Sequence, residues 1–361
     1  MVALALARPY WADPANLTPP PHQPSRKGVA TGILFATRRD IGPSVDPAPR
    51  DGSSNDSKDG CLLPRLIAGL AELAGRYDVI LCDVWGVVHN GAAAFAPALD
   101  ALARFRAKGG AVALITNSPA PSRIVQAQLD SFGAPRATYN AVVSSGDVTV
   151  SLLIERAGQS LFHIGAAAET GLFDEVAATL GAAPRQVAIE RADFVLCTGF
   201  IDFWREKPED YDARLKRIYE RGLDFICANP DLVVEVDGVL SYCAGAIAER
   251  YQRLGGNVIQ AGKPYAPIYD RALARAAAAQ GAVADRARVL AIGDAMRTDI
   301  SGAAAQGFDS LFVTSGIHRD ELHGSESNRG AAGAGLDAAA LRQFVEAAGV
   351  TPTAAIAELV W

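Results

Sequence analysis

Residues 79–87 read VILCDVWGV. The four apolar residues before Asp83 predict a short buried strand that ends at this aspartate. A helical stretch, 97–108, follows, and the next apolar run, 111–115, ends in Thr116. Strands that alternate with helices of this length are typical of a parallel sheet with right-handed crossovers. The fold predicted around Asp83 is therefore α/β.

The same alternation returns in the last third of the chain. We expect strands at 258–260, 289–292 and 310–313, with helices between them. The intervening segment contains strand-like runs of its own. Before the strand that ends at Asp83, residues 62–74 predict an amphipathic helix.

These patterns predict three parts. Residues 1–60 hold 9 of the 20 prolines and a long polar run, which predicts disorder. Residues 61–140 and 258–361 are expected to form a Rossmann-like, doubly wound parallel core, and residues 141–257 an inserted α/β domain. Whether residues 1–60 are a targeting segment or result from an upstream start codon stays open.

Composition excludes several classes of function. The chain has 361 residues and a formal net charge of −6, which argues against nucleic acid as a partner. No apolar run is long enough for a membrane span, so no membrane partner is expected. The five cysteines form no C-x-x-C pair, which favours a reducing cytoplasm over a disulfide framework. An enzyme acting on small molecules is left, and a homodimer stays open.

Polar side chains follow four of the expected strands. Asp83 and Thr116 end the first two, Lys263 follows 258–261, and Asp294 and Asp299 follow the strand at 289–292. Because parallel strands present their carboxyl ends at one edge, these groups should converge. Clustered carboxylates repel one another unless a cation lies between them, and oxygen ligands suit Mg²⁺. A carboxylate there can attack phosphorus while lysine and threonine hold the phosphoryl oxygens.

The order of these residues resembles the four motifs of the haloacid dehalogenase superfamily of phosphohydrolases. The resemblance covers residues 62–318, and its motifs are similar to those of the class IIA branch at Thr116-Asn117, 228–231 (ANPD), 261–264 (AGKP) and 298–300 (TDI). Members of that branch carry an α/β cap between the second and third motifs. The resemblance therefore implies a Mg²⁺-dependent hydrolase of a small phosphorylated metabolite, whose identity the sequence does not specify.

The resemblance also implies a role for each motif residue. Asp83 would be the nucleophile that forms an aspartyl-phosphate, and Thr116 and Lys263 would bind the phosphoryl group. Asp83, Asp294, Asp299 and the backbone carbonyl of Trp85 would hold the metal directly or through its water.

Trp85 is a departure from the family pattern, which has a second aspartate there as the general acid. An indole N–H cannot act as an acid near neutral pH. The alternative function is therefore a weakened pseudoenzyme that binds a phosphometabolite or a protein. His89 could replace the acid, or it could be a surface turn residue.

Two residues after the second motif complete the candidate site. Asn117 and Ser118 are candidates for substrate contact. For Ser118, a helix N-cap is the equally weighted alternative.

Overall fold

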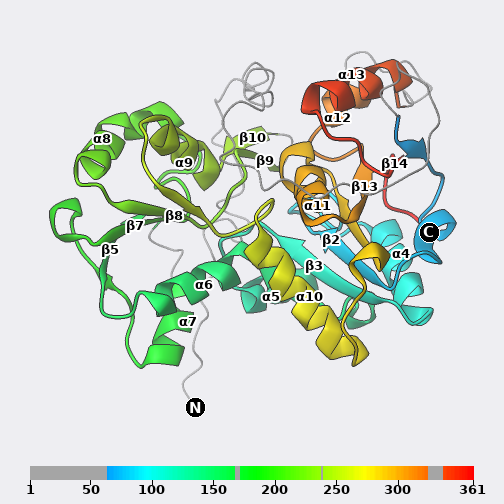
Figure 1. The fold of residues 1–361 in the computed structure, drawn as a ribbon, viewed down its shortest axis with the longest axis horizontal. Coiled ribbons are helices and arrows are strands. Elements are labelled where there is room, and N and C mark those ends of the chain that lie inside the picture. Colours follow the sequence, from blue (N-terminus) through cyan, green and yellow to red (C-terminus); the bar gives the residue numbers. More distant parts are fainter. Residues whose placement is uncertain (1–62, 167–170, 237–238, 324–335) are drawn as a thin grey trace, which may run out of the picture.

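The described part of the chain comprises residues 63–166, 171–236, 239–323 and 336–361 of a computed structural model. The expected disorder of residues 1–60 lies outside these residues and stays a prediction. The described residues form two parallel sheets, with a two-stranded hairpin between them (Figure 1).

The larger sheet has seven parallel strands in the order β1-β14-β13-β12-β2-β3-β4. Its strands are β1 (Arg65–Leu66), β2 (Val79–Asp83), β3 (Ala111–Thr116), β4 (Ala141–Ser144), β12 (Val289–Gly293), β13 (Asp309–Val313) and β14 (Ala354–Ile356). Strand β2, which ends at Asp83, therefore lies inside the sheet, between β12 and β3. The predicted parallel α/β core is confirmed.

Helices cover both faces of this sheet because successive side chains of a strand point to opposite sides. Ile80 and Cys82 pack in one apolar cluster with α4 and α5, whereas Val79 and Leu81 pack in another with α10 and α11. The helices around the larger sheet are α3 (Ala71–Ala74), α4 (Ala96–Ala107), α5 (Ser122–Ser131), α10 (Ala266–Gln280), α11 (Ser301–Gln306), α12 (Arg319–His323) and α13 (Ala338–Ala348). The doubly wound prediction is thus confirmed.

The second sheet has five parallel strands in the order β11-β8-β7-β5-β6. They are β5 (Ser160–Ile164), β6 (Arg185–Gln186), β7 (Phe194–Cys197), β8 (Asp224–Cys227) and β11 (Val258–Gln260), and the antiparallel hairpin is β9 (Val233–Val236) with β10 (Val239–Tyr242). Helices α8 (Asp212–Glu220) and α9 (Ala244–Arg253) cover one face, and α6 (Ser145–Glu155) and α7 (Gly171–Leu180) cover the other (Figure 1). None of the described helices has both the length and the apolar character that a membrane span requires.

Three details of the structure differ from the expected elements. Residues 141–144, which the predicted boundary assigns to the inserted segment, form strand β4, which pairs with β3 in the larger sheet. Strand β11 was expected in the core, but it pairs with β8 in the second sheet. Residues 63–74 form the short strand β1 and the single-turn helix α3 instead of one amphipathic helix. Each difference comes from hydrogen bonds to distant strands, which a local apolar pattern does not encode.

Candidate active site

The candidate site lies where three neighbouring strands of the larger sheet end. β2 ends at Asp83, β3 at Thr116 and β12 one residue before Asp294. These strands are adjacent and parallel in the order β12-β2-β3, so their carboxyl ends meet at one edge. Ligands of open parallel sheets bind at this edge.

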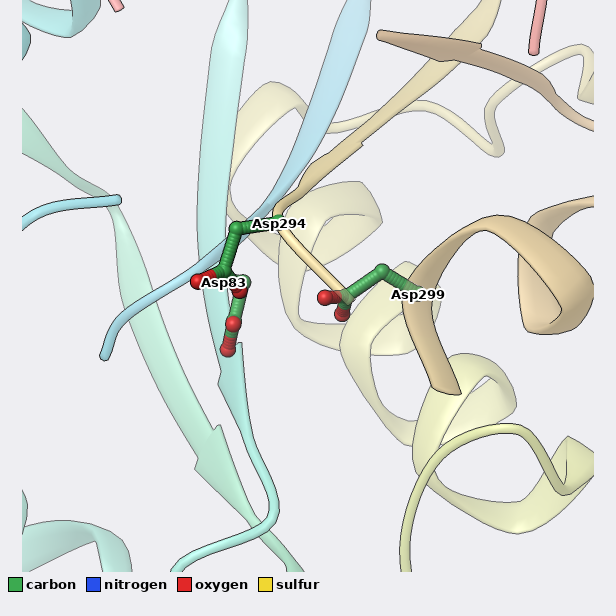
Figure 2. A group of neighbouring side chains, drawn as sticks. All are labelled: Asp83, Asp294 and Asp299. Carbon is green, nitrogen blue, oxygen red and sulfur yellow. The ribbon is translucent and has the colours of Figure 1, made fainter. Parts of the chain in front are cut away.

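Three carboxylates meet there. Asp83, Asp294 and Asp299 lie together in Figure 2, and one oxygen of each is within 4.8 Å of the others. All three side chains are buried. Asp299 comes from the π-helical turn η6 (Met296–Ile300), which follows β12. The structure therefore brings together the three predicted metal ligands that act through side chains, while the Trp85 carbonyl stays a predicted ligand.

Lys263 carries the positive charge of the site. Its ammonium is 2% exposed and donates to Asp83 Oδ1 at 2.6 Å and to Asp299 Oδ1 at 2.7 Å. Burial alone would lower the pKa of Lys263, but the carboxylates of Asp299 and Asp83 outweigh it and raise the pKa well above the usual value. The amine is therefore held as an ammonium between two carboxylates, and its role in phosphoryl binding stays a prediction.

The three carboxylates carry more negative charge than the single ammonium of Lys263 can balance. Burial, followed by the negative charge of Asp299, raises the pKa of Asp83 although Lys263 opposes the rise. Burial and the charges of Asp83 and Asp299 raise the pKa of Asp294 well above its usual range. A bound cation would relieve this repulsion, and a buried, all-oxygen donor set suits a hard divalent ion. The residues present therefore fit Mg²⁺.

Two glycines that sequence reasoning missed form a cradle for Asp294. A Cβ on Gly86 or on Gly316 would overlap the Asp294 carboxylate. The backbone N–H of Ile317 donates to Asp294 Oδ2 at 2.8 Å and fixes that carboxylate. Gly86 stands next to the motif and has a φ of +81°, but nothing in the sequence marks Gly316, which is distant along the chain.

Asn117 connects the sheet edge to two other segments. Its amide oxygen accepts from the backbone N–H of Lys263 at 2.7 Å, and its NH₂ donates to Asp231 Oδ1 at 2.9 Å and to the Lys263 carbonyl at 3.1 Å. Asp231 ends the ANPD motif that follows β8, and the resemblance implied no role for it, although a polar residue after an apolar strand is a usable signal. A substrate contact by Asn117 stays a prediction, since the structure commits this amide to protein partners.

The hydroxyl groups of Thr116 and Ser118 differ in their hydrogen bonds. The Thr116 hydroxyl oxygen accepts from the N–H of Ser118 at 3.1 Å and keeps its own hydrogen available for a phosphoryl oxygen. The Ser118 hydroxyl accepts from the N–H of Ala120 at 3.3 Å. Helix α5 begins at Ser122 with Pro121 at its N-cap, so the alternative of Ser118 as a helix cap is wrong.

His89 is buried in the loop after β2. Its Nδ1 accepts from the N–H of Gly91 at 2.9 Å, and its ring lies 5.1 Å from the rings of both Trp85 and Phe132. Burial lowers the pKa of His89 to about 4. A neutral imidazole is a poor proton donor at neutral pH, so this environment weighs against His89 as the substitute acid. The alternative of a surface turn is wrong, because the ring is 1% exposed.

Trp85 links the two sheets through the hairpin. Its indole N–H donates to the backbone carbonyl of Glu235 in β9 at 2.9 Å. A Cβ on Gly91 would overlap the indole ring, so the loop closes tightly against it. The side chain two residues after Asp83 is therefore a fixed aromatic wall.

A cavity of about 110 Å³ opens from the strand ends toward the second sheet. Val84, Trp85, His89, Thr116 and Ser118 line it from the larger sheet. Residues from the second sheet and from the hairpin close the other side. The cavity therefore lies beside the ends of β2 and β3, between the larger sheet and the second sheet with its hairpin.

Comparison with known proteins agrees with this geometry. The family model of haloacid dehalogenase-like hydrolases matches residues 80–179, and a HAD-hydrolase-like model matches residues 260–336. A curated D-glycerol 3-phosphate phosphatase of Mycobacterium tuberculosis is 28% identical over 258 residues. That match covers 69% of this chain and 66% of the relative, so the chain spans just under two thirds of that protein.

Two solved structures resemble the fold. The crystal structure of a hydrolase of the haloacid dehalogenase-like family from Brucella suis is 43% identical, with a TM-score of 0.69, and covers 82% of this chain and 100% of its own. The magnesium complex of glycerol phosphate phosphatase from Mycobacterium tuberculosis is 25% identical, with a TM-score of 0.52, and covers 75% and 78%. Sequence, fold and site agree: the chain belongs to the haloacid dehalogenase-like hydrolase family.

Proposed function

We propose that the chain is a Mg²⁺-dependent phosphohydrolase that acts on a small phosphorylated metabolite through an aspartyl-phosphate at Asp83. One observation carries the proposal. Asp83 ends an inner strand, is buried, and has one oxygen bonded to an ammonium that also contacts Asp299. A carboxylate oriented in this way beside a phosphoryl-binding lysine suits nucleophilic attack.

The chain's own groups would act in two steps. The second oxygen of Asp83 attacks phosphorus, and the ester bond to the leaving oxygen breaks with its electron pair. Lys263 and the Thr116 hydroxyl stabilise the negative charge on the phosphoryl oxygens. Water then attacks phosphorus of the aspartyl-phosphate, releases orthophosphate and restores the Asp83 carboxylate.

The metal would be held by Asp83, Asp294, Asp299 and the Trp85 carbonyl. Mg²⁺ supplies positive charge to the phosphoryl oxygens when bound. The second sheet with its hairpin would serve as the cap, since it closes the cavity that Val84, Trp85 and Thr116 line at the strand ends.

Turnover of p-nitrophenyl phosphate with Mg²⁺, measured with an EDTA control, tests this function. Asp83→Asn should lower the rate by at least roughly 10³-fold, because an amide is a poor nucleophile of nearly equal volume. Asp100→Asn, on the exposed surface of α4, is the matched control and should leave the rate unchanged. A wild-type rate in Asp83→Asn would contradict the proposal, and wild-type protein without turnover on any phosphate ester would favour the binding-only alternative.

A further inference from the structure

The wall of the cavity is rich in aromatic rings. Trp85 contributes from the larger sheet, Phe200 and Phe203 from the loop after β7, and Tyr242 from the end of β10. Phe200 stacks on Tyr242 at 6.0 Å between ring centroids. Valine side chains complete the apolar wall. A substrate part placed here would exchange water for flat apolar surface, which favours an aromatic ring.

The wall offers no positive charge to a second anionic group. Of the lining residues that the structure describes, none is lysine or arginine, and the charged one is Asp231. Asp231 is held by Asn117 and has its pKa raised, chiefly by burial. A carboxylate or a second phosphate on the substrate would therefore lie beside the Asp231 carboxyl, with no lysine or arginine among the described lining residues to pair with it, which is unfavourable.

Two polar groups of the wall already have protein partners. The Thr198 hydroxyl is 2.9 Å from Nε2 of His163, and the Asn229 side-chain oxygen accepts from the N–H of Asp231 at 3.0 Å. A polyol would have to find partners for its hydroxyls among the few remaining polar groups of a mostly apolar wall, and a buried hydroxyl without a partner is unfavourable. The cavity therefore disfavours glycerol-like groups.

Trp85 supplies an independent argument about the leaving group. Its ring borders the cavity two residues after Asp83, and its indole N–H is bonded to the carbonyl of Glu235. An indole cannot protonate a departing oxygen near neutral pH. The leaving oxygen must therefore be stable as an anion, as a phenol oxygen is and an alkyl alcohol oxygen is not.

We propose that the site takes aryl phosphates, that is, phosphate monoesters of a single aromatic ring without a second anionic group. The inference rests on the proposed function and names its substrate class. The cavity of about 110 Å³ has room for a single ring at most, since an engineered apolar cavity of roughly 150 Å³ accommodates one benzene ring.

Binding of non-hydrolysable phosphonates to the wild-type protein with Mg²⁺ tests the preference for an aromatic ring without involving turnover. Calorimetry should show phenylphosphonate binding at least tenfold more tightly than 2,3-dihydroxypropylphosphonate and than 4-carboxyphenylphosphonate. Equal affinities for the three would overturn the inference even if p-nitrophenyl phosphate is hydrolysed through Asp83. Phosphonate preference without any turnover would instead refute the phosphohydrolase function.

Variants locate the effect in the cavity. Phe203→Ala should weaken phenylphosphonate at least fivefold and leave the affinity for inorganic phosphate unchanged, because only the ring site is altered. Tyr219→Ala removes an exposed aromatic ring on α8 and should change neither affinity. Gln128→Lys adds a cation to the wall and should selectively strengthen 4-carboxyphenylphosphonate. Phenylphosphonate affinity that is unchanged in Phe203→Ala would overturn the assignment of the ring to this cavity.

Discussion

Trp85 occupies the position at which the resemblance to the haloacid dehalogenase superfamily implies a general-acid aspartate. In the structure, the indole instead donates a hydrogen bond to β9 and forms one wall of the cavity. The rate should therefore depend steeply on the pKa of the leaving group. Trp85→Asp should flatten this dependence by accelerating alkyl phosphates by up to about 10²-fold. Rates for a series of esters of graded leaving-group pKa measure it.

Trp85→Phe is the matched control because it keeps a ring in the wall and adds no acid. Its dependence on leaving-group pKa should equal that of the wild type. A wild-type rate that does not depend on the pKa of the leaving group would contradict the account. If the rate then became dependent on this pKa in His89→Ala, His89 would be identified as the proton donor despite its own lowered pKa.

The cradle around Asp294 gives a prediction about metal affinity. In Gly316→Ala the added methyl would overlap the Asp294 carboxylate and displace it. We expect Mg²⁺ affinity to fall at least tenfold by calorimetry while the melting curve stays cooperative. Gly75→Ala, where a Cβ meets nothing within 4 Å and φ is −67°, is the control and should bind Mg²⁺ like the wild type. Equal Mg²⁺ affinities in the two variants would exclude the cradle.

Buried His89 should make stability depend on pH. Its pKa falls from 6.5 in the unfolded chain to about 4 in the folded protein, so the unfolded chain binds the extra proton between these values. The contribution of neutral His89 to the free energy of unfolding is therefore fully present above pH 6.5. It is lost as the pH falls toward 4, and the loss is about 2 kcal/mol at pH 5. Urea unfolding at pH 7.5 and 5 should show a smaller loss in His89→Asn, which keeps an acceptor for Gly91. Parallel losses in the two proteins would refute the assignment.

At the residue scale, the residues of the candidate site could be predicted where they end or directly follow a strand. Asp83, Thr116 and Asp294 end or follow adjacent strands, so an apolar run and its last residue were enough to find them. Gly316 could not be found, because its role is to leave space for a side chain that is distant in the sequence. The lowered pKa of His89 also depends on tertiary burial.

At the scale of elements, Asn117 joins the end of β3 to the segment after β11 and to the segment after β8. Asn117→Ala would remove three hydrogen bonds, two of them buried, and leave Asp231 without its amide partner. We expect a loss of about 2–4 kcal/mol in the free energy of unfolding, measured with urea. Asn257→Ala removes an exposed Asn–Asp hydrogen bond and should lose less than about 1 kcal/mol. Similar losses in both variants would contradict the bridging role.

The elements themselves were predictable to different degrees. Strands β2, β3 and β12 are continuous apolar runs that are buried on both faces, so their sequence alone indicates them. Strand β11 has three half-buried residues, and its sheet is set by pairing with β8. The local pattern of such a short strand carries no information about its partner.

At the scale of the whole molecule, the two sheets contribute different parts of the candidate site. The larger sheet carries the three carboxylates at the ends of β2 and β12, Lys263 lies between β11 and α10, and the loop after β7 and the hairpin supply most of the aromatic wall. The sequence predicts a core and an inserted segment, and this domain division stays a prediction. It does not predict the cavity, because the cavity wall combines side chains from the loop after β7, from the hairpin and from the loop after β2.

The central claim is that Asp83 forms a bond to phosphorus. The most direct test is to quench wild-type protein during turnover of p-nitrophenyl phosphate, reduce it with borohydride, and analyse the peptides by mass spectrometry. An aspartyl-phosphate is reduced to homoserine, whereas a free carboxylate is not. The account predicts homoserine at position 83, dependent on substrate and Mg²⁺. Turnover without homoserine at this position, or with homoserine at another aspartate such as Asp231, would contradict it.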